Sequence, residues 1–232
     1  MTSLAEILHK PENIELIKGI AEEIKAEHKV IPYLPRGEVV PFDEWRKKLI
    51  EISEFVNPLV SSNIGLPEIE ADRQRGFTRY NNQKRTIYIA AHDTYEYDFI
   101  GAAAHENAHH LQLMRAICIP EWMMSEVLKE GFARGIEKLV CREYAHRNNN
   151  PRYVLEVLDE IRLNLDSFFN MSRAYLVPGL ERERENSNKY AYGTAAFLLA
   201  EKINGTDIYR RVFQSHRPYR LLTGFLDGSV KL

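Results

Sequence analysis

Apolar residues recur every three or four positions along most of the chain, which is the spacing of helices with one buried face. The pattern predicts helices in the first sixty residues and again from residue 96 onward. The predicted helices cover residues 5–10, 12–28, 42–56, 96–115, 120–146, 151–176, 188–203 and 206–214. We expect Pro11, Pro120 and Pro151 to lie in first helical turns, where the fixed φ of proline fits, and Pro58 to end the third helix.

A short segment between these helical regions has the composition of strands instead. The stretch "TIYIA" opens a predicted strand at 86–91 and is rich in β-branched and aromatic residues, and Asn81-Asn82 separates it from another β-prone segment. This arrangement predicts a hairpin or small antiparallel sheet directly before the helix at 96–115. The predicted fold class is therefore α+β and mainly helical, with residues 1–60 as an N-terminal helical segment that joins residues 61–232 in one compact domain.

Composition narrows the possible partners. The 31 lysines and arginines nearly balance the 33 aspartates and glutamates, which argues against a nucleic-acid-binding or membrane-surface protein. No run approaches the ~20 apolar residues that span a bilayer, so we expect no membrane partner and a soluble, cytoplasmic protein. Cys118 and Cys141 are too few for a disulfide framework or a four-thiolate zinc site, and we expect both thiols to be reduced and buried.

The clearest chemical signal is "AAAHENAHHLQLM" at residues 102–114. His105 and His109 are one helical turn apart, so both imidazoles can reach a single zinc ion, and Glu106 beside them can reach a metal-bound water. His110 is rotated about 100° from the ligand face, and we expect it to face solvent or to contact a ligand from outside. The His-Glu-x-x-His pattern also arises by chance, so a third ligand is needed to support a catalytic metal site.

Glu130 is the strongest candidate for that third ligand. A third histidine in the same segment is excluded, because Gln112 and Arg115 occupy the positions where the extended motif has glycine and histidine. Gly131 follows Glu130 inside a predicted helix, where it suggests a close approach of two backbones. Glu137 lies about two turns further along this helix and could accept a hydrogen bond from the outer nitrogen of a ligand histidine. The alternative for both glutamates is a solvated helix face.

Three segments together resemble the gluzincin metallopeptidases, zinc peptidases with His-Glu-x-x-His on one helix and a glutamate ligand on the next. "KEGFARGIE" at 129–137 resembles the "NEGFAxxxE" segment of the aminopeptidase branch, and "KYAYGTAAFLLAEKINGTDIYRRVF" resembles the family's "Y-x-x-G" helix at Tyr190 and Gly193. The chain length is similar to that of the compact minigluzincins. Because no "G-x-M-E-N" segment precedes the zinc helix, the resemblance implies an endopeptidase rather than an aminopeptidase.

The resemblance implies a zinc metallopeptidase catalytic unit at residues 61–232 that hydrolyses a peptide or protein substrate. Its zinc ligands are His105, His109 and Glu130. Glu106 is the expected general base toward the metal-activated water, and the hydroxyl of Tyr190 is expected to stabilise the oxyanion. Tyr192 is the rival for that role, but it points about 200° away on the same helix. Strand 86–91 is expected to line the cleft and to pair with the extended substrate.

The main alternative is a non-catalytic, zinc-containing peptide-binding or regulatory protein that binds an extended peptide by edge addition to strand 86–91. A structural zinc site is a further alternative, although such a site needs four protein ligands and the two cysteines are poorly placed to supply the fourth. The sequence leaves the role of two segments open. "VPGLERERENSNK" at 177–189 is a solvated loop or a lid, and "LLTGFLDGSVKL" at 221–232 is an ordinary packed end or an inhibitory segment over the cleft.

Overall fold

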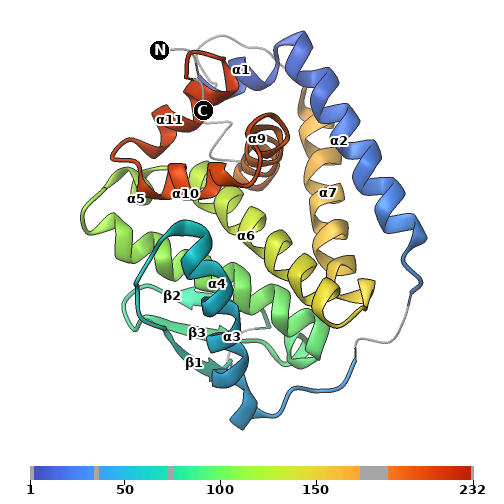
Figure 1. Cartoon of the computed structure of the whole chain (residues 1–232), viewed down its shortest axis with the longest axis vertical. Coiled ribbons are helices and arrows are strands. Elements are labelled where there is room, and N and C mark those ends of the chain that lie inside the picture. Colours follow the sequence, from blue (N-terminus) through green and yellow to red (C-terminus); the bar gives the residue numbers. More distant parts are fainter. Residues whose placement is uncertain (1–2, 34–36, 73–75, 173–187, 231–232) are drawn as a thin grey trace.

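The computed structural model describes residues 3–33, 37–72, 76–172 and 188–230, and Figure 1 shows its elements coloured along the chain. The helices are α1 (Leu4–Leu8), α2 (Pro11–Val30), α3 (Phe42–Val60), α4 (Glu96–Ala116), α5 (Glu121–Met124), α6 (Glu126–Arg147), α7 (Leu155–Ser172), α9 (Lys189–Asn204), α10 (Asp207–Gln214) and α11 (Pro218–Leu226). The strands are β1 (Glu68–Ala71), β2 (Arg79–Asn81) and β3 (Thr86–Ile89), and the 3-10 turns η1 (Ala91–Thr94) and η2 (Pro151–Val154) precede α4 and α7. Within these ranges, every helix is too short or too polar to cross a membrane.

The structure confirms the predicted α+β, mainly helical class, but several helix boundaries differ. The predicted helix at 151–176 begins as the 3-10 turn η2, and its last four residues lie outside the described ranges. Pro58 lies inside α3 rather than at its end, because the buried Val60 holds the last turn against the core even though the proline donates no hydrogen bond. The predicted helix at 120–146 is divided at Ser125. The hydroxyl of Ser125 accepts a hydrogen bond from the N–H of Leu128 and so begins α6 as a separate helix.

The C-terminal helix α11 lies beyond the last predicted helix and packs against α1, α5 and α9. Its side chains of Leu222, Phe225 and Leu226 are buried, and Pro218 occupies its first turn. Burial of three large apolar side chains attaches this helix firmly to the core. The described part of the tail at 221–232 is therefore an ordinary packed end.

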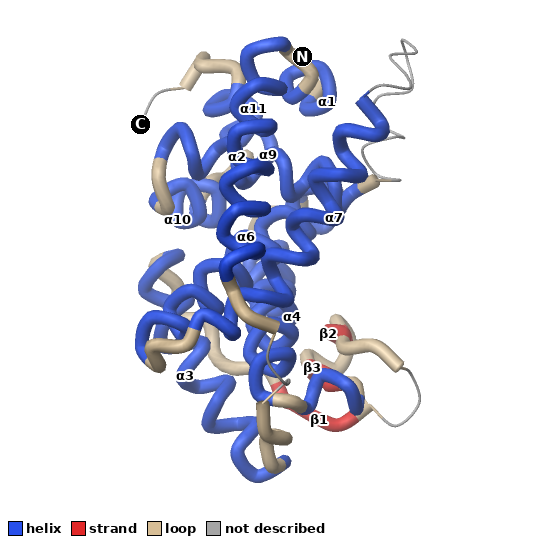
Figure 2. The backbone as a smooth tube through the Cα atoms, turned by 90° about the vertical axis from the view of Figure 1, so that its right-hand side faces the viewer, coloured by secondary structure: helices blue, strands red, loops and turns tan. Residues whose placement is uncertain are grey.

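The three strands form one mixed sheet in the order β1-β3-β2. β2 and β3 pair antiparallel through the predicted hairpin, with Tyr80 opposite Ile87, whereas β1 runs parallel to β3. Figure 2 shows the sheet on one side of the helical body, next to α4. Because β3 is the central strand, its backbone groups already pair on both sides, and the predicted addition of a peptide to strand 86–91 is wrong.

The central helix of the fold is α6, which packs most extensively against α9 and α4 (Figure 1). The backbones of α6 and α9 touch at Gly131 and Gly193. A Cβ atom on Gly193 would lie 2.6 Å from the carbonyl oxygen of Val127 and 2.7 Å from the nitrogen of Gly131, so a side chain does not fit there. The close approach predicted from Gly131 is confirmed.

A single hydrophobic core connects the first sixty residues with the rest of the described chain, and it includes Leu8 and Leu49 together with Phe132 and Leu199. Cys141 is buried in this core, as predicted. Cys118 is exposed, and the prediction that it is buried is wrong, because it lies in the turn after α4 rather than on a helix face.

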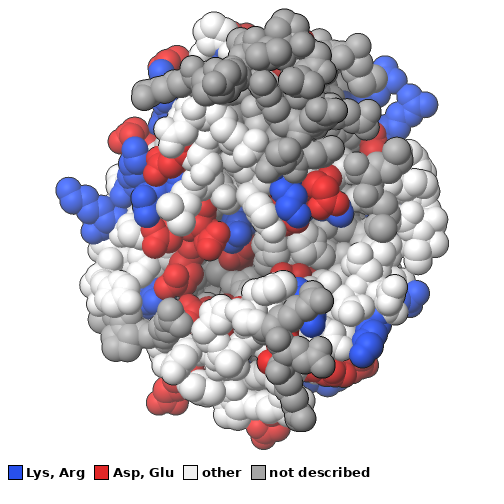
Figure 3. Space-filling view, turned by 180° about the vertical axis from the view of Figure 1, so that it is seen from behind, with Lys and Arg blue, Asp and Glu red and all other residues white. Residues whose placement is uncertain are grey.

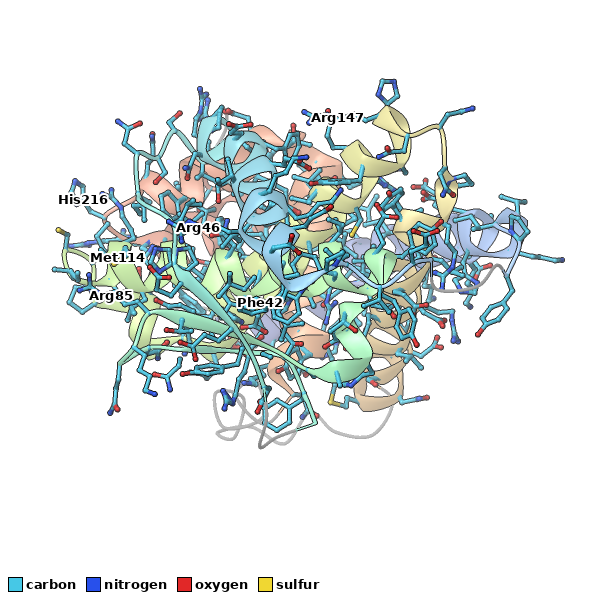
Figure 4. The ribbon with its side chains drawn as sticks, turned by 90° about the horizontal axis from the view of Figure 1, so that it is seen from below. Phe42, Arg46, Arg85, Met114, Arg147 and His216 are labelled. Carbon is cyan, nitrogen blue, oxygen red and sulfur yellow. The ribbon has the colours of Figure 1, made fainter. Side chains whose placement is uncertain are left out.

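The far end of α4 lies near the tip of the hairpin. In the view from below, the labelled side chain of Met114 in α4 and that of Arg85 in the turn between β2 and β3 lie at the same end of the molecule (Figure 4). Contacts of α4 with both β2 and β3 fix this arrangement. The fold therefore places the His-Glu-x-x-His helix between the sheet on one side and α6 on the other.

Candidate metal centre

His105 and His109 lie one turn apart on α4 and face Glu130 of α6. The Nε2 atoms of both rings are 3.5 Å from Oε2 of Glu130, and one ligand atom from each residue lies within 4.8 Å of the others. The two rings meet nearly at right angles, with centroids 4.9 Å apart. The structure thus brings together the three residues that the sequence analysis named as zinc ligands. We call these three residues the candidate metal centre.

Oε2 of Glu130 is the atom of the centre that most needs a partner. The side chain is 7% exposed, and among the described residues this oxygen has no hydrogen-bond partner, since 3.5 Å is too long for a good N–H···O bond. A buried carboxylate oxygen without a partner is costly, whereas a cation between the three ligand atoms would satisfy it. Two imidazole nitrogens and one carboxylate oxygen are also a common ligand set of catalytic zinc, so the residues fit this ion.

Each histidine of the centre is held by a hydrogen bond from its outer nitrogen. His105 Nδ1 donates to Oε2 of Glu137 over 2.9 Å, which is the contact predicted for that glutamate. His109 Nδ1 donates to Oε1 of Gln112 over 2.9 Å, and the amide nitrogen of Gln112 donates to the carbonyl oxygen of Lys129 over 2.9 Å. Because Nδ1 is the donor in both rings, both Nε2 atoms are turned toward the centre as metal ligands require.

Three further residues support the centre, and the sequence analysis assigned none of them a role. Arg134 Nη1 donates to Oε2 of Glu137 over 2.6 Å and so fixes the carboxylate that holds His105. Arg134 and Gln112 lie three residues from Glu137 and His109, so helical spacing was a signal that could have found them. The third, Lys189, reaches the centre from α9, and no local spacing indicates it.

Protonation of His105 and binding of a metal ion at the candidate metal centre oppose each other. Burial alone would lower the pKa of His105, but contacts with Glu130 and Glu137 outweigh it and raise this pKa to about 9. Burial would likewise raise the pKa of Glu130, but the two neighbouring histidines outweigh it and lower this pKa. Without a metal, His105 therefore carries a proton at neutral pH, and an arriving metal ion has to displace it.

Glu106, the predicted general base, is half-buried on α4, and it lines a cavity together with His105 and Tyr190. Burial raises the pKa of Glu106, and the neighbouring His109 and His105 oppose this shift. A carboxylate whose pKa is raised is better suited to take up a proton from water.

Tyr190 and Tyr192 have different surroundings at the start of α9. Tyr190 is 43% exposed and lines the same cavity as Glu106, and partial burial raises its pKa. Tyr192 is 4% exposed, and its hydroxyl is 3.1 Å from Nε2 of His9. Of the two, Tyr190 is therefore the one that a substrate in the cavity can reach.

His110 does not face solvent, so this part of its prediction is wrong. The ring is buried, its Nδ1 accepts a hydrogen bond from the hydroxyl of Tyr80 over 2.7 Å, and its Nε2 donates to the carbonyl oxygen of Gly65 over 2.8 Å. Burial lowers the pKa of His110. Since both ring nitrogens are used in these bonds, His110 connects α4 to β2 and to the segment before β1.

Two cavities flank the centre. The larger, about 500 Å³, lies on the side of His105 and Glu106, and the smaller, about 170 Å³, lies on the side of His109 and Glu130. Acidic side chains predominate among the charged residues of the larger cavity: Asp93, Asp98, Glu106, Glu137, Glu156 and Glu160. On the face opposite to that of Figure 1, acidic side chains gather beside a central hollow (Figure 3).

The strand β2 runs past both cavities. Thr78, next to its start, lines the larger cavity, and Tyr80 lines the smaller one. In the described ranges β2 pairs with β3 alone, so it is an edge strand of the sheet. An edge strand beside the centre offers unpaired backbone groups to an extended peptide.

The open question on "VPGLERERENSNK" falls largely outside the described residues, which omit 173–187. Its last residue, Lys189, begins α9.

Comparison with known proteins adds no relative: no protein-family model, curated protein or solved structure matches the chain. The residues of the centre and its cavities therefore carry the functional argument by themselves.

Proposed function

We propose that the protein is a zinc-dependent peptidase of the gluzincin type that cleaves internal bonds of peptide or protein substrates. The observation that carries this proposal is the buried Oε2 of Glu130, which has no hydrogen-bond partner among the described residues. It faces the Nε2 atoms of His105 and His109, and Glu106 occupies the position next to His105 on α4. Three ligands and a neighbouring carboxylate are the set that metal-assisted hydrolysis requires.

His105, His109 and Glu130 would hold the zinc ion, which supplies an acidified water and polarises the carbonyl group of the substrate when it is bound. Glu106 takes the proton from the attacking water and passes it to the nitrogen of the leaving amine. Its raised pKa supports this role, because a carboxylate of higher pKa accepts a proton from water more readily. The hydroxyl of Tyr190 donates a hydrogen bond to the carbonyl oxygen as negative charge develops there.

Two features support an endopeptidase rather than an aminopeptidase. The cavities lie on both sides of the centre, so a chain can extend from the site of cleavage in both directions. The edge strand β2 passes both cavities and can pair with several consecutive residues of a substrate. The substrate strand in this proposal lies along β2, since β3 has no free edge.

The second candidate function is a zinc-containing peptide-binding or regulatory protein that uses the same cleft without catalysis. The edge strand β2 supports this function as well, because peptide addition needs no general base. Glu106 separates the two candidates: a protein that only binds peptide has no use for a half-buried carboxylate with a raised pKa next to the proposed metal-bound water. The two free cysteines support a reducing compartment such as the cytoplasm for either function.

A digest of a peptide library tests the proposal. Wild-type protein, Glu106→Gln and the control Glu143→Gln are loaded with zinc, checked for one ion per chain, and incubated with the library. Glu143 suits the control because it lies on α6 and pairs with Arg147 at the surface. We expect internal cleavage by the wild type and the control, and none by Glu106→Gln. Equal cleavage by all three proteins would defeat the assignment of Glu106. Tight peptide binding without cleavage by the wild type would favour the second function.

A further inference from the structure

Lys189 contacts the carboxylate oxygen of Glu130 that the two histidines do not face. Its Nζ lies 2.8 Å from Oε1 of Glu130 and 3.3 Å from Oε2 of Glu126, one turn earlier on α6. The two oxygens of Glu130 therefore have different surroundings. Oε1 is paired with an ammonium group, whereas Oε2 faces the Nε2 atoms of His105 and His109.

The crossing of α6 and α9 explains why Lys189 reaches this carboxylate. Gly131 and Gly193 touch backbone to backbone, Glu130 directly precedes Gly131, and Lys189 lies one turn before Gly193. The contact of the two glycines thus brings the first turn of α9 against the metal-binding turn of α6. The same turn of α9 carries Tyr190, whose ring centre is 5.0 Å from Nζ of Lys189.

We propose that Lys189 is a positioning residue that keeps Glu130 a one-oxygen metal ligand. A carboxylate can bind a metal ion through one oxygen or through both, and the second oxygen would occupy space that the attacking water needs. An ammonium group on Oε1 opposes this, because the metal ion would have to replace a charge-assisted hydrogen bond to gain that oxygen. This inference rests on the proposed function, in that it requires a metal ion at the centre.

Cobalt(II) in place of zinc tests the inference without a measurement of activity. Four-coordinate cobalt absorbs visible light much more strongly than five-coordinate cobalt, so band intensity reports whether Glu130 has added its second oxygen. We expect Lys189→Met to bind cobalt at least as tightly as the wild type, because a repelling cation is gone, but with bands that are several-fold weaker. Lys189→Arg keeps the charge and should keep the wild-type intensity.

The matched control is Lys202→Met, which removes an exposed lysine of α9 that pairs with Glu23. It should keep the wild-type spectrum. Wild-type band intensity in a folded Lys189→Met protein overturns the inference, and so does loss of cobalt binding by that protein. If Lys189→Met does not fold, Lys189→Gln is measured against the same outcomes. Failure of the wild type to bind cobalt or zinc would instead refute the proposed function. Failure of the inference on Lys189 and failure of the proposed function therefore give different results.

Discussion

The backbones of Gly131 and Gly193 are in contact where α6 crosses α9, directly beside Glu130 of the candidate metal centre. A methyl group at residue 193 would have to push the two helices apart. We expect Gly193→Ala to lower the free energy of unfolding by about 1–3 kcal/mol and to weaken zinc binding, because overpacking moves Glu130 away from α4. Chemical denaturation and chelator competition measure the two effects.

The control for this substitution is Gly19→Ala in α2, where a Cβ atom would meet nothing within 4 Å. Since alanine is the better helix former, this variant should be more stable than the wild type by about 0.5–1 kcal/mol, with unchanged zinc binding. A Gly193→Ala protein as stable as Gly19→Ala would show that the crossing tolerates a side chain.

Tyr190→Phe and Tyr192→Phe should separate catalysis from stability. Tyr190 lines the larger cavity, so loss of its hydroxyl should reduce kcat on the order of a hundredfold and leave zinc content and unfolding nearly unchanged. Tyr192 contacts His9 in the interior, so loss of its hydroxyl should cost about 1 kcal/mol of stability and leave kcat unchanged. Steady-state kinetics and thermal unfolding distinguish the two variants. A loss of kcat in Tyr192→Phe and a loss of stability in Tyr190→Phe would exchange the two assigned roles.

Glu137→Ala should weaken zinc binding by about 10–100-fold, because His105 then loses the acceptor of its Nδ1 hydrogen bond. Competition with a chelator measures the affinity. The comparison is Glu156→Ala, which removes a carboxylate from the same cavity that is bonded to Arg152 instead of to a ligand histidine. Equal losses in the two variants would mean that the general charge of the cavity, rather than the hydrogen bond, sets the affinity.

Metal removal should make the stability of the protein depend on pH between about 6.5 and 9. In the metal-free protein, contacts with Glu130 and Glu137 raise the pKa of His105 from 6.5 to about 9. The contribution of the protonated ring to stability is therefore fully present below pH 6.5 and is lost as the pH rises through 9. Thermal unfolding in chelator should show a falling midpoint over this range. His105→Asn should flatten this fall, and an equally steep fall in that variant would contradict the assignment.

Helical periodicity, a local property, was enough to put His105, Glu106 and His109 on one helix and Glu130 and Glu137 on the next. The meeting of these two helices at Glu130 was supported by the resemblance to the gluzincins, not by spacing. Contacts between helices and strands could not be predicted from such periodicity. The parallel pairing of β1, the central position of β3 and the reach of Lys189 from α9 depend on segments that are far apart in the chain. Gly131 is the exception, since a glycine inside a helix predicted a close approach of another backbone, although it did not identify Gly193 as the partner.

The amide of Gln112 links the two helices that carry the candidate metal centre. It joins His109 of one helix to the backbone of Lys129, the residue before Glu130, on the next. The donor atoms are thus prearranged by bonds that involve no ion, and capture needs little reorganisation of the protein. A chelator should strip such a site without melting the fold, and a different divalent ion should enter the same scaffold afterwards. Under the proposed function, the identity of the bound ion would then depend on cellular supply as much as on the shape of the centre.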